Sequence, residues 1–311
     1  MSSKEPKVSV IIPTFNRTEK VKRAIDSCLD QTYPNLEVVV VDDGSTDGSP
    51  AFLNQLARDE PRLIVQCNPE NRGGNYCRNQ GFKIASGEYV VFLDSDDKFH
   101  PDKIRNQIDR FGDDDQLDCV VAPTQVMQEH TDEEVRRTDG RIKWKPLPGL
   151  SHLEMYVTKR TAWLTHEPMW KKSFLDPQPF SIRLKNSQEY EFHCRTLAKG
   201  PRVDILDTCL ATVYLHDGVE RINGPSRKKT GKMRDHFKSK ILSRYMVART
   251  LKDRNLTSTA TLRYLAKFSS SILVRCFRIS PSHGFAMTRY LLKCNLDLLA
   301  GSGDSLTESA K

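Results

Sequence analysis

The sequence lacks several features that mark membrane, secreted or zinc-binding proteins. No apolar run approaches the length of a membrane span. The N-terminal stretch MSSKEPKVSV has no apolar core of the kind found in signal peptides, so we expect a protein made and kept in the cytoplasm. The eight cysteines form no C-x-x-C pair and have no paired histidine spacing. This pattern favours reduced, mostly buried thiols over disulfides or a zinc site.

Charge is unevenly distributed along the 311 residues. Residues 225–311 contain 18 Lys and Arg against 5 Asp and Glu, a net charge of +13, so with +8 for the whole chain residues 1–224 carry −5. We therefore expect a main domain at 1–224, with a first half at 1–110 and a second at 111–224. A basic helical extension at 225–300 and a disordered tail at 301–311 would follow.

Short strands alternate with helical patterns through the first 120 residues. Runs rich in β-branched and aromatic residues occur at 8–12, 36–41, 63–66, 89–93 and 117–122, and Pro13 is expected to stop the first. Helical spacing follows at 18–29, 49–58 and 187–199, and residues 202–216 alternate as edge strands do. This pattern predicts an α/β fold with a mostly parallel sheet flanked by helices and right-handed crossovers.

Carboxylates follow the strand in GEYVVFLDSDD, residues 87–97. Asp94, Asp96 and Asp97 come where the chain leaves the sheet, and ligands of open α/β folds collect at the carboxyl ends of strands. Clustered carboxylates suit a hard divalent cation, Mg²⁺ or Mn²⁺. The alternative is a solvated acidic turn that caps the next helix. The 13–17 turn and Asp42–Asp43 also end strands, so the fold would bring all three features to one edge.

Four stretches in order carry a family resemblance: VSVIIPTFNR at 8–17, VVVVDDGSTDGS at 38–49, NRGGNYCRNQGF at 71–82 and GEYVVFLDSDD at 87–97. Together they cover roughly the first 110 residues, and the sequence resembles a family 2 glycosyltransferase of the bacterial polysaccharide or glycolipid type. The resemblance implies a GT-A fold, which is Rossmann-like. It also implies that residues 1–110 bind the nucleotide-sugar and that 111–224 form the acceptor half.

The resemblance assigns a donor site to these stretches. It implies that the turn at Pro13 and Thr14 packs against the base or ribose. Asp43 would accept a hydrogen bond from the base. Because a carboxylate can only accept hydrogen bonds, a base with an N–H donor such as uracil is favoured, and hence a UDP-sugar. An Asx-turn with Gly44 is the alternative for Asp43. The implied nucleotide-sugar-binding residues are Pro13, Thr14, Asn16, Arg17, Asp43, Asn75, Arg78, Asp94 and Ser95.

The Asp94-Ser95-Asp96 triplet matches the family's D-x-D signature. The resemblance implies that Asp96 binds a divalent metal, Mn²⁺ or Mg²⁺, which neutralises the departing nucleoside diphosphate. Arg78 suits ribose or diphosphate oxygens, with a surface arginine as the alternative. His216 is a second metal-side candidate, although a lone histidine is often structural.

The catalytic base is expected at the start of the 187–199 helix. Family members carry an E-D pair there, and in this chain Gln188 and Glu189 stand in its place. We predict Glu189 as the base that takes the acceptor's proton, with Glu191 as the second candidate. A carboxylate that only stabilises the helix N-terminus is the alternative. Trp163, His166 and Trp170 are candidates for an acceptor wall, because aromatic faces suit sugar rings; the alternative is that they are buried and serve packing.

These features predict an inverting, metal-assisted transferase, of the hexosyl- or N-acetylhexosaminyl-transferase type. It would move a sugar from a nucleoside-diphosphate-sugar to a hydroxyl of a glycan or lipid-linked acceptor. A sugar nucleotidyltransferase is one alternative, but VIIPTFNRTEK lacks the glycine-rich phosphate loop that such an enzyme needs. A non-catalytic scaffold that binds nucleotide or carbohydrate is the other, and Gln188 keeps it open.

The basic extension has two interpretations. A basic amphipathic helix can lie on an anionic membrane surface, which would make the protein peripheral on the cytoplasmic face. The other interpretation is that these helices pack on the catalytic domain or mediate oligomerisation. No recognition motif for nucleic acid accompanies the charge, so no nucleic-acid partner is expected.

Overall fold

The computed structural model describes residues 5–129, 147–215, 230–256, 258–279 and 284–292. The chain divides into two compact units. The first comprises residues 1–145, 162–182 and 201–217, and the second comprises 146–161, 183–200 and 218–311. This division cuts across the boundary expected near residue 224, because two segments from within 111–224 belong to the same unit as the basic helices.

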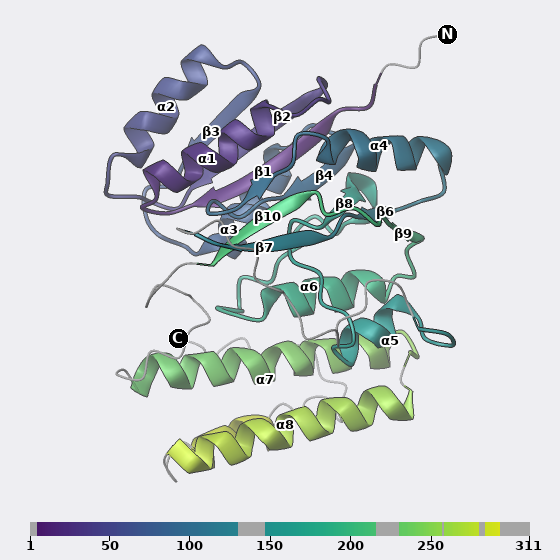
Figure 1. The fold of residues 1–311 in the computed structure, drawn as a ribbon. Helices are drawn as coiled ribbons and strands as arrows, with labels where there is room; N and C mark the ends of the chain where they lie inside the picture. Colours follow the sequence, from purple (N-terminus) through teal and green to yellow (C-terminus); the bar gives the residue numbers. More distant parts are fainter. Residues whose placement is uncertain (1–4, 130–146, 216–229, 257, 280–283, 293–311) are drawn as a thin grey trace. The chain divides into compact units, whose positions relative to one another are not determined.

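A seven-stranded sheet forms the centre of the first unit (Figure 1). Its strand order is β3-β2-β1-β4-β8-β6-β9, parallel throughout except that β8 runs antiparallel to both β4 and β6. The strands are β1 (Val8–Thr14), β2 (Leu36–Asp42), β3 (Leu63–Cys67), β4 (Tyr89–Phe92), β6 (Cys119–Val121), β8 (Pro168–Lys171) and β9 (Val203–Ile205). The predicted α/β class with a mostly parallel sheet is confirmed.

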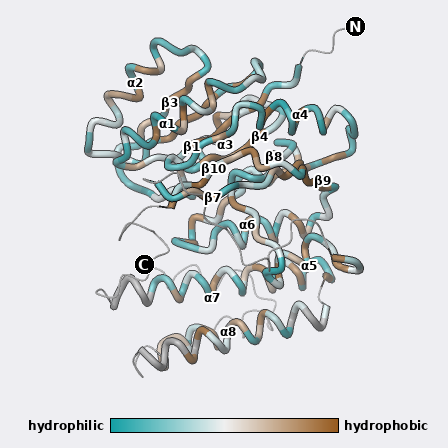
Figure 2. The backbone as a smooth tube through the Cα atoms, viewed as in Figure 1, coloured by the Kyte–Doolittle hydropathy of each residue, from teal (hydrophilic) through white to brown (hydrophobic). Residues whose placement is uncertain are grey.

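Helices join these strands as the sequence pattern predicts. They are α1 (Thr18–Leu29), α2 (Ser49–Asp59), α3 (Gly74–Ile84) and α4 (Lys103–Asp113), with a short 3₁₀ turn, η1 (Lys172–Phe174), after β8. Along α1 the hydropathy colours alternate between teal and brown (Figure 2). Its inward residues Val21, Ala24, Ile25 and Cys28 are fully buried. Burial of such an apolar stripe stabilises a helix that is too short to be stable alone.

A second, three-stranded sheet belongs to the same unit. It consists of β5 (Lys98–Phe99), β10 (Ala211–Leu215) and β7 (Thr124–Gln128), in the order β5-β10-β7. Residues 202–216 were expected to be edge strands. That is correct for β9, but β10 is the middle strand of the small sheet, paired antiparallel to β5 and parallel to β7.

Pro13 does not stop the first strand. β1 continues to Thr14 and pairs with β2 throughout, with Pro13 opposite Val41. The β4 ladder ends earlier, where Ile11 lies opposite Phe92 and accepts a hydrogen bond from Leu93. Successive residues of a strand direct their backbone groups to opposite neighbouring strands, so Pro13 faces β4, as Ile11 does. The pairing with β4 has already ended at Pro13, so its missing N–H removes no hydrogen bond from the sheet.

A buried carboxylate ties together the amino-terminal edge of the sheet. Glu37 accepts hydrogen bonds from Ser9 Oγ at 2.6 Å and from the Ser86 backbone at 2.6 Å, and it pairs with Lys7 at 2.5 Å. Burial alone would raise the pKa of Glu37, but these donors outweigh it and lower the pKa to about 2. One side chain thus fixes the starts of β1, β2 and β4.

The second unit is helical. It contains α5 (His152–Val157), α6 (Gln188–Leu197), α7 (Thr230–Asp253), α8 (Thr259–Ile279) and a further helix at 284–292. The predicted helical character of the basic extension is therefore confirmed. Buried Ile241, Leu242 and Tyr245 of α7 pack with Ile272 of α8. None of the helices in the described part of the chain is long and apolar enough to cross a membrane.

Candidate functional site

The carboxyl ends of three neighbouring strands meet at one edge of the large sheet. Thr14 at the end of β1 lies opposite Asp42 at the end of β2, and Ile11 lies opposite Phe92 at the end of β4. The predicted meeting of the three strand ends is therefore what the register produces.

The turn after β1 is bonded to the turn after β2. The Asn16 backbone N–H donates to Ser45 Oγ, and Asn16 Oδ1 accepts from the Thr46 backbone, each at 2.8 Å. Asn16 has φ of 50°, a left-handed conformation that asparagine tolerates better than most residues. Asn16 is thus a structural link between two strand ends, in addition to the donor contact that the sequence predicts for it.

Arginines pair with the first and third residues of the acidic triplet. Arg78 of α3 lies 2.5 Å from Asp94, and Arg17 lies 2.7 Å from Asp96. A third arginine, Arg23 of α1, donates to the backbone carbonyl of Asp96 at 2.5 Å. Burial acts to raise the pKa of Asp94, but the charge and hydrogen bond of Arg78 prevail and hold that pKa below its ordinary value. Each of the two carboxylates therefore has an arginine as its ion-pair partner.

Asp97 has a different environment from the two acids before it. Its buried carboxylate accepts from the Tyr214 backbone at 3.3 Å and lies 3.6 Å from His166 Nδ1. His166 Nε2 in turn bonds Thr124 Oγ1 at 2.9 Å. Burial, followed by the adjacent carboxylates, raises the pKa of Asp97 well above its ordinary value. Asp97 does not cap the next helix, whose N-cap is Asp102.

The basic face of α1 was not predicted from the sequence. Lys20 and Arg23 lie 3.6 and 3.7 Å from Glu129, and the Arg23 guanidinium stacks 4.0 Å from the Tyr214 ring centre. With Arg17 they form an i, i+3, i+6 series, which places three cations on one side of the helix. That spacing is the signal by which the sequence could have revealed this face.

Asp43 organises the loop that leads into α3. Its two oxygens accept from the Arg72 and Gly73 backbone amides, each at 2.8 Å. The alternative of an Asx-turn with Gly44 is not what Asp43 forms; the local hydrogen bond in this turn is made by Asp42, which accepts from the Ser45 backbone at 2.9 Å. Bonding to a base, the role predicted for Asp43, would use its remaining lone pairs.

Residues of α3 hold the segment that follows β8 in the first unit. The Asn79 amide donates to the Phe180 carbonyl at 2.7 Å and accepts from the Phe180 N–H at 2.9 Å. Asn75 donates to the Ser181 carbonyl at 2.9 Å. The Phe180 ring lies 5.4 Å from the Arg78 guanidinium. Asn75 therefore has a structural partner, and Arg78 is oriented by both Asp94 and an aromatic ring.

The remaining residues that are predicted to bind the nucleotide-sugar differ in their exposure to solvent. Pro13 and Ser95 are buried. Thr14 is also buried, and its Oγ1 has no hydrogen-bond partner among the residues that the structure describes. Phe15, between Thr14 and Asn16, exposes 40% of its surface. Sequence reasoning assigned Phe15 no role, although an exposed aromatic ring on this turn can stack on a base.

The predicted base lies in the second unit. Glu189 is half-buried in the first turn of α6, whereas Glu191 is buried and pairs with Arg195 at 2.7 Å. A general base must reach its substrate, so the half-buried Glu189 suits that role better than Glu191. His216, the second predicted metal ligand, lies outside the described residues.

The suggested aromatic acceptor wall is wrong. Trp163 and Trp170 are fully buried, and Trp170 stacks on Phe174 with ring centres 6.0 Å apart. His166 is also buried, where it faces Asp97. Large aromatic side chains contribute more stability by burial than exposed rings can, and in the sequence the two cases look alike.

The acidic turn suits a divalent cation that shares its coordination with a ligand. Asp94 and Asp96 offer hard carboxylate oxygens, the donors that Mg²⁺ and Mn²⁺ prefer. In the described part of the chain, no group of three or more His, Cys, Asp or Glu could hold a metal by itself. These residues fit an ion that is bound by one or two carboxylates and takes phosphate and water oxygens as its other ligands.

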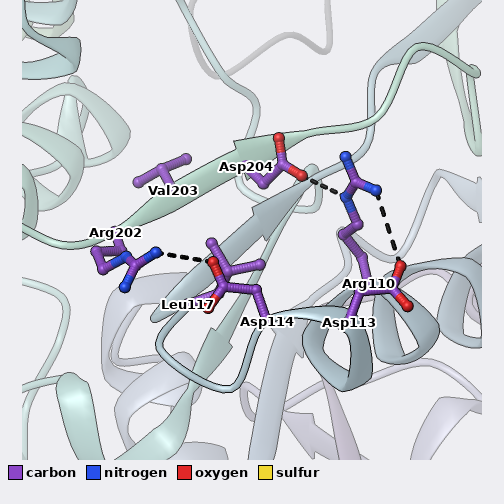
Figure 3. Close-up of a pocket in the computed structure, with 7 residues that line it drawn as sticks. All are labelled: Arg110, Asp113, Asp114, Leu117, Arg202, Val203 and Asp204. Carbon is purple, nitrogen blue, oxygen red and sulfur yellow. Dashed lines mark hydrogen bonds and ion pairs between the residues drawn. The ribbon is translucent and has the colours of Figure 1, made fainter.

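The hollow in Figure 3 lies at the amino-terminal ends of β6 and β9, whereas the candidate site lies at the carboxyl ends of β1, β2 and β4. It has a volume of about 490 Å³ and is lined by residues at the starts of β6 and β9 and the end of α4. Arg110 pairs with Asp113 and Asp204, and Arg202 pairs with Asp114 at 2.8 Å. Two arginines against three aspartates give the wall a formal charge of −1, and both arginines already pair with these aspartates, so the hollow does not suit an anionic ligand such as a nucleoside diphosphate.

Comparison with known proteins identifies the sequence family. The family model described as "Glycosyl transferase family 2" matches residues 9–169. Among curated relatives, TuaG of Bacillus subtilis, a glycosyltransferase assigned to teichuronic acid biosynthesis, is 40% identical over 109 residues. That match covers 35% of this chain and 43% of TuaG, so the chain spans less than half of this relative.

Two solved structures share the fold. TarS 1–349 of S. aureus in complex with UDP-GlcNAc has a TM-score of 0.66 at 22% identity, over 94% of this chain and 80% of TarS 1–349. The mannosyltransferase PcManGT of Pyrobaculum calidifontis, in complex with GDP-Man and Mn²⁺, has a TM-score of 0.53 at 18% identity, over 96% of this chain and 88% of that one.

Proposed function

Because the chain belongs to glycosyltransferase family 2 and has the GT-A fold, we propose that it transfers a sugar from a nucleoside-diphosphate-sugar to an acceptor hydroxyl. The observation that carries the proposal is the single sheet edge where the turns after β1, β2 and β4 meet. There an exposed aromatic ring, two arginines and two accessible carboxylates are gathered. These groups suit a base, a diphosphate and a metal respectively.

The donor is bound by the β1 turn, the α3 loop and the acidic turn. Phe15, Pro13 and Thr14 contact the base and ribose, and Asp43 accepts from a base N–H. Arg17 and Arg78 change partners from Asp96 and Asp94 to the diphosphate oxygens, to which a planar guanidinium can donate two hydrogen bonds. UDP is the favoured nucleotide, since a carboxylate suits the uracil N–H and TarS was solved with UDP-GlcNAc.

Asp96, with Asp94 beside it, holds the divalent cation that the family implies. When bound, that ion supplies Lewis-acid stabilisation of the departing diphosphate. Mn²⁺ is a reasonable candidate because PcManGT was solved with Mn²⁺. The chain's own contribution is to keep Asp94 ionised, since Arg78 holds the pKa of that carboxyl below its ordinary value.

Glu189 acts as the general base in an inverting transfer. It takes the proton from the acceptor hydroxyl while that oxygen attacks the anomeric carbon from the face opposite the leaving group. The acceptor is a hydroxyl of a glycan or lipid-linked glycan, in keeping with the assignment of TuaG to teichuronic acid biosynthesis. The activity is of the hexosyl- or N-acetylhexosaminyl-transferase type.

The test is donor turnover by the purified chain. UDP-, GDP- and dTDP-sugars are first ranked by the thermal shift that they produce, with and without Mn²⁺. Hydrolysis of the best donor is then followed in the parent, Asp96→Asn and Glu189→Gln. Both variants should lose at least about 100-fold in turnover, the usual loss when a general base or an electrostatic stabiliser is removed.

Asp109→Asn is the matched control, because Asp109 is an exposed carboxylate on α4 whose loss should not change turnover. Donor binding by a parent that shows no metal-dependent turnover would support the non-catalytic scaffold instead. Release of pyrophosphate from a sugar phosphate and nucleoside triphosphate would support the nucleotidyltransferase.

A further inference from the structure

The helix at 284–292 packs on the second unit through one face. Met287 is fully buried, and Ala286, Tyr290 and Leu291 are partly buried in the same hydrophobic cluster. The cluster also contains residues of α7 and α8. These four residues follow helical spacing, so they form a single stripe that attaches the helix to the unit.

The opposite face of this helix is also apolar. Phe285 exposes 63% of its surface and Leu292 exposes 56%. They are seven residues apart, with exposed Arg289 between them at i+4, so the three side chains lie along one outward stripe. Two large apolar side chains beside a cation on one exposed stripe are unusual for a surface that faces only water.

The surrounding charge has one sign. Residues 259–292 contain five Lys and Arg (Arg263, Lys267, Arg275, Arg278 and Arg289) and no Asp or Glu. On α8, Arg263 and Lys267 are exposed, and Val274, seven residues after Lys267, exposes 51% of its surface. An outward face of α8 therefore repeats the combination of cations and an exposed apolar side chain.

We propose that this face, consisting of Phe285, Arg289 and Leu292, together with Arg263 and Lys267 of α8, binds an anionic lipid surface. The two apolar side chains enter the boundary between headgroups and acyl chains, and the cations pair with lipid phosphates. The helix lies on the bilayer and does not span it, in agreement with the hydropathy of the described helices. This goes beyond the proposed function, since it concerns where the protein binds and not what it transfers.

A second copy of the chain fits this face less well. In a two-fold interface each patch meets its own copy, so Arg289, Arg263 and Lys267 would face the same cations. With no carboxylate in residues 259–292 to neutralise them, such pairing is opposed by charge repulsion. An anionic lipid surface supplies the missing negative charge.

The test is co-sedimentation of the full chain with vesicles. Phosphatidylcholine vesicles are compared with vesicles that also contain phosphatidylglycerol. We expect binding only to the anionic vesicles, reduced by high salt. The double substitution Phe285→Ser with Leu292→Ser should weaken that binding at least about tenfold, because both apolar groups would lose their burial. Arg289→Glu should also weaken it.

Two matched controls make the same chemical changes elsewhere. Ile182→Ser removes an apolar side chain that is 61% exposed in the first unit, and Lys83→Glu reverses an exposed charge on α3. Both should bind anionic vesicles as the parent does. Equal binding by every variant, or no binding by the parent, would overturn the proposal. So would a lower molar mass of the double variant in light scattering, because that would identify a second copy as the occupant.

Donor turnover without vesicles separates this proposal from the transferase assignment. The double variant should unfold at the parent's temperature and turn over donor at the parent's rate. A parent that binds anionic vesicles but does not turn over any donor would refute the transferase and leave the lipid surface standing.

Discussion

Replacement of Arg17 should change the affinities for metal and donor in opposite directions. Arg17 pairs with Asp96 at 2.7 Å, so a cation that binds Asp96 must displace the guanidinium. Once displaced, Arg17 can bind the diphosphate. Arg17→Ala removes the competitor of the metal and, at the same time, a proposed ligand of the donor.

The magnitudes follow from exposure. The side chains of Arg17 and Asp96 are 28% and 22% exposed, and pairs of this kind contribute about 0.2–1 kcal/mol. Without donor, Arg17→Ala should therefore strengthen Mn²⁺ binding by about 1.4- to 5-fold. Loss of a charge-assisted bond to phosphate costs about 1.5–3 kcal/mol, so donor affinity at saturating metal should fall about tenfold or more.

The assays are an electron paramagnetic resonance titration of free Mn²⁺ and a calorimetric titration of the donor. Lys22→Ala is the matched control, since Lys22 is a cation of α1 that pairs with exposed Asp26 at 2.6 Å. It should leave both affinities unchanged. If Arg17→Ala weakens Mn²⁺ binding or leaves it unchanged, the displacement reasoning is refuted, and an unchanged donor affinity would remove Arg17 from the diphosphate site.

Three further predictions concern stability. Glu37→Gln should destabilise the fold by at most about 3 kcal/mol at pH 7, as measured by urea unfolding. Because the pKa of Glu37 in the folded protein is lowered to about 2, the difference in unfolding free energy between parent and variant should shrink by more than half at pH 3. Burial lowers the pKa of Lys103 to about 7, so Lys103→Met should stabilise by about 1–4 kcal/mol at pH 6, an advantage that declines as pH rises from 7 to 10. Gly81→Ala would place a Cβ 2.5 Å from Ile11 and should cost about 1–3 kcal/mol in thermal unfolding, whereas Gly112→Ala, with open space around it, should not destabilise. A Lys103→Met advantage that does not vary with pH, or a Gly81→Ala protein as stable as Gly112→Ala, would contradict these assignments.

Much of the first 120 residues was predictable because strand order follows from local pattern. Continuous apolar runs such as Val38–Val41 have no exposed face, so they indicate central strands, and the polar turns after them then have to meet at one edge. The acidic turn and the arginine of α3 could be located in the same way.

Side-chain partners at that edge were not predictable from pattern. Arg23 reaches the carbonyl of Asp96 across 73 positions in the sequence, and only the packing of α1 brings the two together. Similarly, Asp43 resembles a free ligand in the sequence, yet both its oxygens accept backbone hydrogen bonds from a loop 29 residues away. Such contacts depend on the distances between helices, strands and loops, and these distances cannot be derived from the hydrophobic periodicity of the sequence.

The grouping of the helices was also beyond the sequence. A change in net charge suggested a domain boundary near residue 224. Net charge affects solubility and the binding of charged partners, but it does not determine which helices pack together. Arg244 of α7, buried between the rings of Tyr190 of α6 and Phe268 of α8 at 3.7 and 4.2 Å, shows that α6 packs with the basic helices. Burial lowers the pKa of Arg244, so this cation contributes packing contacts more than surface charge.

The attachment of Phe180 to α3 has a consequence for communication along the chain. Its ring contacts the guanidinium of Arg78 and, edge-on, the ring of Phe92 in β4, while Asn79 holds its backbone. If a diphosphate draws Arg78 away from Asp94, as proposed, it also changes what this ring contacts. Only seven residues separate Phe180 from the start of α6, so a ligand that binds beside Arg78 would have a short covalent route to the helix that carries Glu189.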